Sequence, residues 1–253
     1  MGKTKLTLAA MAAAFVGTGA TATSVSIDSI TANFGTPTPA GFTDFTTGVA
    51  ADGTASIFWG EPADTGGPIS GYQFAPNSTP FTANAGDIRS LGTFTHFNFP
   101  IQADPGSITG VPLTFSFSGT PDGATSATSF PATFNFEHDE TTNSGGLCPG
   151  DPVPCSDIVS FTAVGGADEV VVVDDIIYTF TVLGFGELDG SGDFDPLNPA
   201  EPFLFITTEG EANSTDLFFT YSTQVIPLPA AGWLMLAGLG ALGAVGRRRK
   251  KAA

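Results

Sequence analysis

Three aspartates in one glycine-rich loop have the residue types and the spacing to bind a metal ion. Asp189, Asp193 and Asp195 lie in the segment DGSGDFDPLN, residues 189–198. Calcium takes about six to eight oxygen ligands in a flexible geometry, which carboxylates in such a loop can supply. The loop is not an EF-hand, because Phe194 stands where that motif requires glycine. The pattern predicts a calcium site, with an acidic loop that binds no ion as the alternative.

His96 lies in the segment LGTFTHFNFPI, residues 91–101, which is rich in strand-forming residues. In a strand, side chains two positions apart share a face, so Phe94, His96 and Asn98 point one way. Apolar residues on both faces predict a central strand. We expect His96 and Asn98 to form a polar pair that fixes the register of this strand, because buried polar groups must be bonded. A ligand-binding histidine is the alternative, although no second histidine is near in sequence.

No catalytic pattern is present in the sequence. It contains no G-x-S-x-G, no H-E-x-x-H and no phosphate-binding glycine loop. His138 is followed by Asp139 and Glu140, which could act as an acid–base group, but the pattern favours a solvated histidine on an acidic surface. The sequence therefore predicts no catalytic residues and a protein that is not an enzyme. A pair of carboxylates that hydrolyses glycans stays open as an alternative.

The first 22 residues have the pattern of a signal peptide. Lys3 and Lys5 precede an apolar run over residues 6–17, and small residues follow up to Ala20 and Ala22. This order of a basic head, a short apolar body and an A-x-A cleavage site predicts export and cleavage after Ala22.

The C-terminal residues 226–253 combine a proline motif, an apolar run and a basic tail. Residues 230–246 carry no charge and are followed at once by five basic residues, 247–251. Seventeen residues are just enough to cross a bilayer core of about 30 Å as a helix. The pattern predicts a transmembrane helix whose basic tail stays in the cytoplasm.

These features resemble the PEP-CTERM protein-sorting signals, of the VPLPA type. The proline motif, the helix and the basic cluster follow in the right order, through the residues Pro227, Leu228, Pro229, Ala230, Arg247, Arg248 and Arg249. The resemblance implies recognition by an exosortase-type membrane transpeptidase of a Gram-negative bacterium and delivery to the cell surface or extracellular matrix. A permanent single-pass membrane anchor is the alternative.

Export bears on the two cysteines, Cys148 and Cys155, which lie in one short loop. Outside the reducing cytosol we expect them to form a disulfide. A zinc site made with the histidines is the alternative, but no close C-x-x-C or H-x-x-x-H spacing supports it.

The exported region, residues 23–225, is strongly acidic. It contains one basic residue, Arg89, and all 25 carboxylates of the chain. Such a surface repels nucleic acid and anionic lipid, so neither is an expected partner. Cations and neutral polymers such as exopolysaccharide are the ligands that this charge allows.

The same region predicts one all-β domain. Short β-branched and aromatic runs alternate with turn residues, which is typical of a two-sheet antiparallel β-sandwich, here expected to be jelly-roll-like. Loops are expected at residues 36–53, 60–68, 120–129, 139–156 and 186–202. The predicted strands are residues 25–34, 54–59, 70–74, 90–99, 107–118, 130–138, 157–164, 169–173, 175–183, 203–208 and 215–222.

A second resemblance covers most of the exported region. Six segments, in their order along the chain, are similar to the THxN family of PEP-CTERM proteins and the related choice-of-anchor K domain. They are SIFWGEP (56–62), ISGYQF (69–74), LGTFTHFNFPI (91–101), ETTN (140–143), CSDIVSF (155–161) and YTFTVLGF (178–185). The motif that gives the family its name would be Thr95, His96, Phe97 and Asn98. The resemblance implies a surface-sorted β domain and adds no catalytic residues.

These observations together predict an exported structural or adhesive component of the bacterial envelope or exopolysaccharide matrix. The alternative is a polysaccharide-binding module that uses Trp59 and Tyr72 as exposed aromatic residues near the loop 61–68. An enzyme acting on matrix glycans is a third hypothesis.

Overall fold

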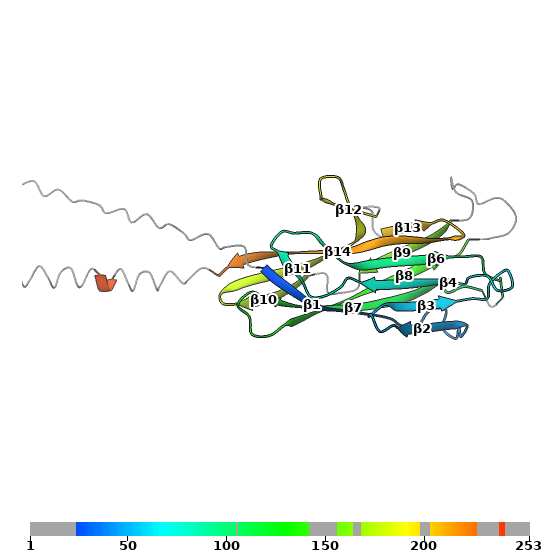
Figure 1. The fold of residues 1–253 in the computed structure, drawn as a ribbon, viewed down its shortest axis with the longest axis horizontal. Coiled ribbons are helices and arrows are strands. Elements are labelled where there is room, and N and C mark those ends of the chain that lie inside the picture. The colour runs from blue at the N-terminus through cyan, green and yellow to red at the C-terminus, as the bar shows by residue number, and fades with distance from the viewer. Residues whose placement is uncertain are drawn as a thin grey trace, which may run out of the picture.

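Two antiparallel sheets make up the exported region in the computed structural model, which describes residues 24–104, 106–141, 156–163, 168–197, 203–226 and 238–240. Every pair of neighbouring strands in these ranges is antiparallel. Figure 1 shows the two sheets stacked in one elongated body. The two-sheet antiparallel architecture predicted from the sequence is confirmed.

The strands are numbered in chain order. Sheet A has the order β13 (Phe203–Thr207), β9 (Asp157–Ala163), β8 (Thr128–Asp139), β7 (Gly110–Pro121), β1 (Ser24–Phe34) and β5 (Phe81–Asn84). Sheet B has the order β10 (Asp168–Val173), β11 (Ile176–Leu188), β14 (Glu211–Val225), β6 (Arg89–Asn98), β4 (Ser70–Pro76), β3 (Ala55–Trp59) and β2 (Phe45–Val49), and β12 (Phe194–Pro196) pairs with β11.

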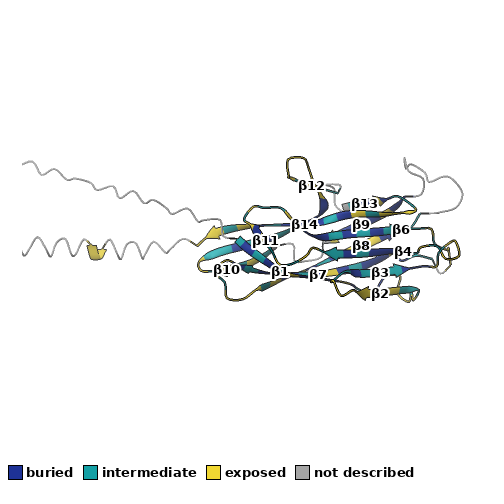
Figure 2. Cartoon of the chain, viewed as in Figure 1, coloured by how far each residue is buried: buried dark blue, intermediate teal, exposed yellow. Residues whose placement is uncertain are grey.

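Aromatic side chains fill the space between the sheets. Phe94 of β6 stacks on Phe136 of β8 with ring centroids 4.8 Å apart. Phe180 of β11 meets Phe130 of β8 at 4.2 Å. These contacts follow from strand alternation, since every second residue of a strand points to the same face. Figure 2 shows the buried residues concentrated in the central strands, while β2 and the loop around β12 are largely exposed.

All eleven predicted strands are present, with ends that differ by a few residues, and three short strands are added. β2 lies inside the predicted loop 36–53 and β12 inside the predicted loop 186–202, so both loop predictions are wrong at these places. β2 has four exposed residues out of five and β12 has three residues in all. Neither strand has the alternating apolar pattern that predicts a strand from sequence. Each is a strand because it pairs with a neighbour, β2 with β3 and β12 with β11.

The two ends of the β domain lie at the same end of the sandwich. Ser24 at the start of β1 pairs with Asn84, and the turn after Asn84 donates a backbone hydrogen bond to Tyr221 near the end of β14. At the opposite end, the last residue of β6, Asn98, pairs with the first residue of β14, Glu211 (Figure 1). We call this opposite end the far end, because it is farthest from the sorting signal.

Several predicted features lie outside the described residues. These are the signal peptide with its cleavage site at Ala20 and Ala22, the Cys148–Cys155 disulfide, and nearly all of the sorting signal. Within the predicted transmembrane segment the structure describes residues 238–240, which are helical. The described part of the chain contains no helix with the length and apolar character needed to cross a bilayer.

Replacing Phe94 tests the aromatic layer between the sheets. Phe94 is fully buried and also contacts the rings of Tyr72 and Phe185. We expect Phe94→Ala to lower the free energy of unfolding by about 3–5 kcal/mol, because it leaves a cavity in a packed core. Urea unfolding of the full chain measures this value. Thr114→Ala, on the exposed face of β7, is the control and should cost less than about 1 kcal/mol. Equal effects of the two substitutions would contradict the assignment of Phe94 to the core.

Candidate functional site

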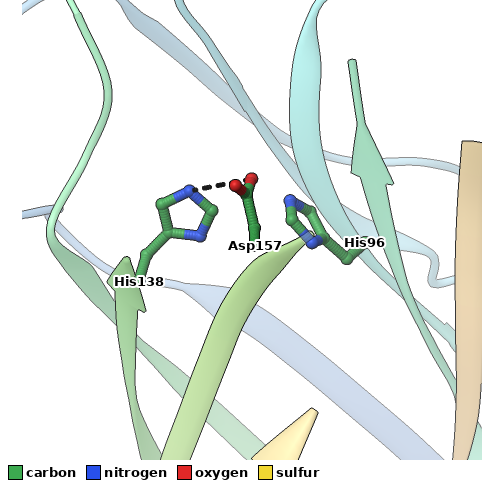
Figure 3. A group of neighbouring side chains, drawn as sticks. All are labelled: His96, His138 and Asp157. Atoms are coloured by element: carbon green, nitrogen blue, oxygen red, sulfur yellow. Dashed lines mark ion pairs between the residues drawn. The ribbon is translucent and has the colours of Figure 1, made fainter. Parts of the chain in front are cut away.

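Two histidines and an aspartate meet between the sheets at the far end (Figure 3). His96 comes from β6 of sheet B, whereas His138 of β8 and Asp157 of β9 come from sheet A. One potential ligand atom of each residue lies within 4.8 Å of the other two. The carboxylate of Asp157 lies between the two imidazole rings, and all three residues are buried. We call these residues, together with Glu140 and Glu209 beside them, the histidine–carboxylate cluster.

Strand alternation brings the two histidines inward. On β6, Phe94, His96 and Asn98 are fully buried while Thr95 between them is partly exposed. On β8, His138 ends an inward row of alternate residues that are otherwise apolar. The rings of His96 and His138 lie 5.2 Å apart and nearly perpendicular to each other. The far end thus places two polar rings where the rest of the interface has phenylalanines.

The hydroxyl group of Thr207 bonds the Nδ1 atom of His96. This hydroxyl lies 2.9 Å from His96 Nδ1 and 3.3 Å from the backbone carbonyl oxygen of Asp157. When the hydroxyl donates its one hydrogen to that carbonyl it accepts from His96, and in this tautomer Nδ1 carries the hydrogen and Nε2 has a free lone pair. Nε2 is buried and has no hydrogen-bond partner among the described residues. Burial, helped by the nearby His138, lowers the pKa of His96 well below its ordinary value, so the ring is neutral at pH 7.

His138 is held at both ring nitrogens. The Tyr72 hydroxyl lies 2.6 Å from Nδ1, and Nε2 lies 3.2 Å from Glu140 Oε2 and 3.8 Å from Asp157 Oδ2. The ring of Trp59 packs edge-on against His138, with centroids 5.3 Å apart. These contacts restrict the imidazole to one orientation, with Nε2 facing two carboxylates.

Two carboxylates of the cluster, Asp157 and Glu209, are protonated more easily than usual. Burial and the nearby Glu140 raise the pKa of Asp157 to about 6, although backbone and side-chain hydrogen bonds from Thr141 oppose the shift. Burial, with smaller contributions from Asp157 and Glu140, raises the pKa of Glu209 to about 7. Burial disfavours a charge that lacks a compensating partner, and carboxylates near each other repel.

Unpaired acceptor atoms concentrate in this region. Among the described residues, seven buried side-chain polar atoms have no hydrogen-bond partner, and five of them belong to the cluster or to the adjacent Asn98. These five atoms are His96 Nε2, Asn98 Oδ1, Asp157 Oδ2 and both carboxylate oxygens of Glu209. Native proteins pair most buried polar groups, so these five atoms leave the site able to accept hydrogens from a bound species or to donate electron pairs to it.

The structure changes the interpretation of both histidines. His138 is not a solvated surface residue: its side chain is fully buried, because it ends the inward row of β8. His96 does have a second histidine beside it, which sequence distance concealed. His96 and Asn98 share a buried face as expected, and both bond Thr207. The structural role of the Thr95, His96 and Asn98 motif stays a prediction.

Sequence reasoning missed Asp157, Glu209 and Thr207 altogether. Asp157 and Thr207 are polar residues at inward positions of strands, and this was the one signal in the sequence that could have marked them as site residues. The sequence could not show which residues they contact, because those contacts depend on how the two sheets stack.

The predicted calcium loop is an ordered turn beside β12. Asp189 Oδ1 accepts hydrogen bonds from the backbone N–H groups of Ser191 and Asp193, at 2.8 and 2.9 Å. These bonds lower the pKa of Asp189. Within the described residues, the one group of three potential metal ligands is the buried one, and it does not include Asp195. Calcium binding by this loop stays a prediction.

Comparison with known protein families identifies the C-terminal segment. Residues 225–250 match the family described as the PEP-CTERM protein-sorting motif. The chain carries a PEP-CTERM sorting signal. The motif implies an exported protein that is sorted by an exosortase, a membrane-bound enzyme, as the sequence predicted. The VPLPA type and the THxN resemblance stay predictions.

A search among curated proteins found none with significant similarity. The role of the β domain therefore depends on what its own residues show.

Replacing Thr207 tests the polar network around His96. We expect Thr207→Val, which keeps the shape, to lower the free energy of unfolding by about 1–3 kcal/mol, because it leaves the Nδ1 hydrogen of His96 and the Asp157 carbonyl without a partner. Thr31→Val is the matched control, because the Thr31 hydroxyl makes one exposed hydrogen bond at 3.3 Å to the backbone of Ser116. Chemical denaturation compares the two variants. If Thr207→Val were no more destabilising than Thr31→Val, the network would not hold this end of the sandwich.

Proposed function

We propose that the protein is a non-enzymatic structural or adhesive component of the bacterial cell surface or its exopolysaccharide matrix. The observation that carries the proposal is the direct connection between fold and sorting signal. β14 ends at Val225, and the matched motif begins at the same residue. The sorting signal is therefore joined directly to the sandwich, at the end where the first and last strands of the β domain meet.

Charge and packing support this role. An exported region with 25 carboxylates and one arginine, most of them outside the core, stays soluble next to an anionic envelope. The far end of the sandwich lies roughly 45 Å from the start of the sorting motif, because β14 extends over fifteen residues from Glu211 to Val225 at about 3.3 Å each. This geometry presents the far end away from the membrane.

Mass spectrometry of the protein recovered from cells tests the sorting step. We expect a mature C-terminus near Pro227 and loss of the Arg247–Arg249 cluster, because exosortase recognition implies cleavage near the motif. A variant with alanine at Pro227 and Pro229 should keep its tail and stay in the membrane fraction. An intact basic tail on the wild-type surface protein would instead establish a permanent anchor.

An attachment assay tests the structural or adhesive role. Cells that lack the protein should retain less exopolysaccharide than wild-type cells, and expression of the full chain should restore retention. The destabilised Phe94→Ala chain is the control for a folded domain and should not restore it. Unchanged retention in the deletion strain would contradict the proposal.

Polysaccharide binding is a second candidate, but not through the aromatic residues that the sequence suggested. Trp59 and Tyr72 are 1% and 0% exposed, because both lie on inward positions of β3 and β4. That prediction is wrong. A groove of about 890 Å³ on the outer side of sheet B, lined by polar and apolar side chains, is the surface that favours a neutral polymer instead. Its lining includes Asn77, Arg89, Thr93, Glu187 and Asp216.

Substituting Asp216 tests this groove. Asp216 Oδ1 accepts a hydrogen bond from Thr93 at 2.6 Å and offers a second oxygen to a sugar hydroxyl. Loss of a hydrogen bond to a charged group should weaken binding of purified exopolysaccharide by about tenfold or more in Asp216→Asn. Asp122→Asn, in an exposed turn outside the groove, is the control. Sugar release during the assay would favour the enzyme hypothesis, whereas equal binding by both variants would exclude the groove.

A further inference from the structure

We propose that the histidine–carboxylate cluster is a structural site for zinc or a similar divalent transition metal, which joins the two sheets at the far end of the sandwich. The ligands are the two imidazoles and the carboxylates of Asp157 and Glu140. This site is distinct from the predicted calcium loop at Asp189.

The ligand atoms have the chemistry and the spacing of a zinc site. Zinc binds imidazole nitrogen and carboxylate oxygen at about 2.0–2.2 Å, so tetrahedral ligand atoms lie roughly 3.4 Å apart. The distances from His138 Nε2 to Glu140 Oε2 and Asp157 Oδ2, 3.2 and 3.8 Å, bracket this value. His96 lies within 4.8 Å of His138 and Asp157, a separation that a small side-chain movement closes. Two imidazoles favour a transition metal over calcium, which prefers oxygen ligands.

Each histidine has the outer partner that metal-binding histidines need. Such residues bond their second ring nitrogen to a fixed polar group, which sets the tautomer and the ring orientation. For His96 the partner is the hydroxyl of Thr207, which leaves Nε2 as an unpaired, fully buried electron donor. For His138 the partner is the hydroxyl of Tyr72 at Nδ1, which leaves Nε2 facing the carboxylates.

The charge of the cluster also favours a bound cation. Three carboxylates lie together, namely Asp157, Glu140 and Glu209, and their charges influence one another. Arg89 is the one lysine or arginine of residues 23–225, and it packs against the ring of Phe81. It lies seven positions along β6 from His96, roughly 23 Å away. A divalent cation bound between the imidazoles would neutralise two carboxylates that Arg89, the one basic side chain among the described residues, lies too far away to reach.

The position of the site indicates a structural role. His96 belongs to one sheet, and His138 and Asp157 to the other, so a bound metal would cross-link the sandwich. The rings of Trp59 and Tyr72 pack against the ring of His96. A catalytic zinc needs an open coordination position for substrate, whereas His96, His138 and Asp157 are buried between packed rings.

Zinc binding by the full chain, purified in detergent without a histidine tag and stripped with a chelator, tests the proposal. We expect one zinc ion per chain on addition of zinc chloride, with a rise in the thermal midpoint that the chelator reverses. X-ray absorption at the zinc edge should show two imidazole ligands. The chain has two histidines in total, so this spectrum identifies the site in the wild-type protein without any variant.

Variants then assign the individual ligands. Asp157→Asn and His96→Gln should each weaken zinc binding by about 100-fold or more, and Thr207→Val, which removes an outer partner, by about 10–100-fold. Asp52→Asn is the matched control for Asp157→Asn and should bind normally, because Asp52 likewise accepts a backbone N–H, from Thr54, in an exposed turn.

Three results would overturn the proposal. The first is that the stripped wild-type chain binds no zinc when zinc chloride is added. The second is a zinc spectrum without imidazole, which indicates an adventitious ion only on surface carboxylates or the cysteines. The third is unchanged affinity in a folded Asp157→Asn or His96→Gln variant. If both variants fail to fold, the number of imidazole ligands in the wild-type spectrum still tests the proposal, because that measurement needs no variant.

Discussion

The packing of phenylalanine rings between two sheets is the interaction on which the rest of this structure depends. Phe94 against Phe136 and Phe180 against Phe130 each join a strand of sheet B to the same strand, β8, of sheet A. Burial of aromatic area is the main source of stability available to a domain with so few charged pairs. Because the rings interdigitate, they also fix how far the sheets slide and which ends of the strands face each other.

That alignment creates the polar site at the far end. Beyond Phe94 on β6 comes His96, and beyond Phe136 on β8 comes His138, so the facing rows change from phenylalanine to histidine at matching positions. The two rings then meet at 5.2 Å, and the start of β9 adds Asp157 between them. The same stacking that forms the core therefore also brings together groups that a hydrophobic core would exclude. Buried ionisable groups cost stability unless they are paired or coordinate an ion.

Several features of the site were accessible from the sequence, and others were not. The alternation in residues 91–101 correctly placed Phe94, His96 and Asn98 on one buried face. The same reasoning applied to residues 130–138 would have placed His138 inward, but the neighbouring acids Asp139 and Glu140 suggested a solvated surface. Trp59 and Tyr72 were misassigned for a related reason. Aromatic residues beside a loop resemble a sugar-binding surface in sequence, whereas their inward positions on β3 and β4 bury them.

The sequence by itself determined the class of fold, the inward or outward direction of most strand residues, the acidic charge, and the sorting signal, which the family match at residues 225–250 confirms. These properties are local, because the period of a strand and the order of residues in a signal are set by neighbours along the chain. Tertiary structure alone decided that His96 meets His138 and Asp157. These residues are separated by 42 and 61 positions and lie on different sheets. Strand periodicity specifies a face but never the partner across it, since the partner depends on the stacking of two sheets and on their register.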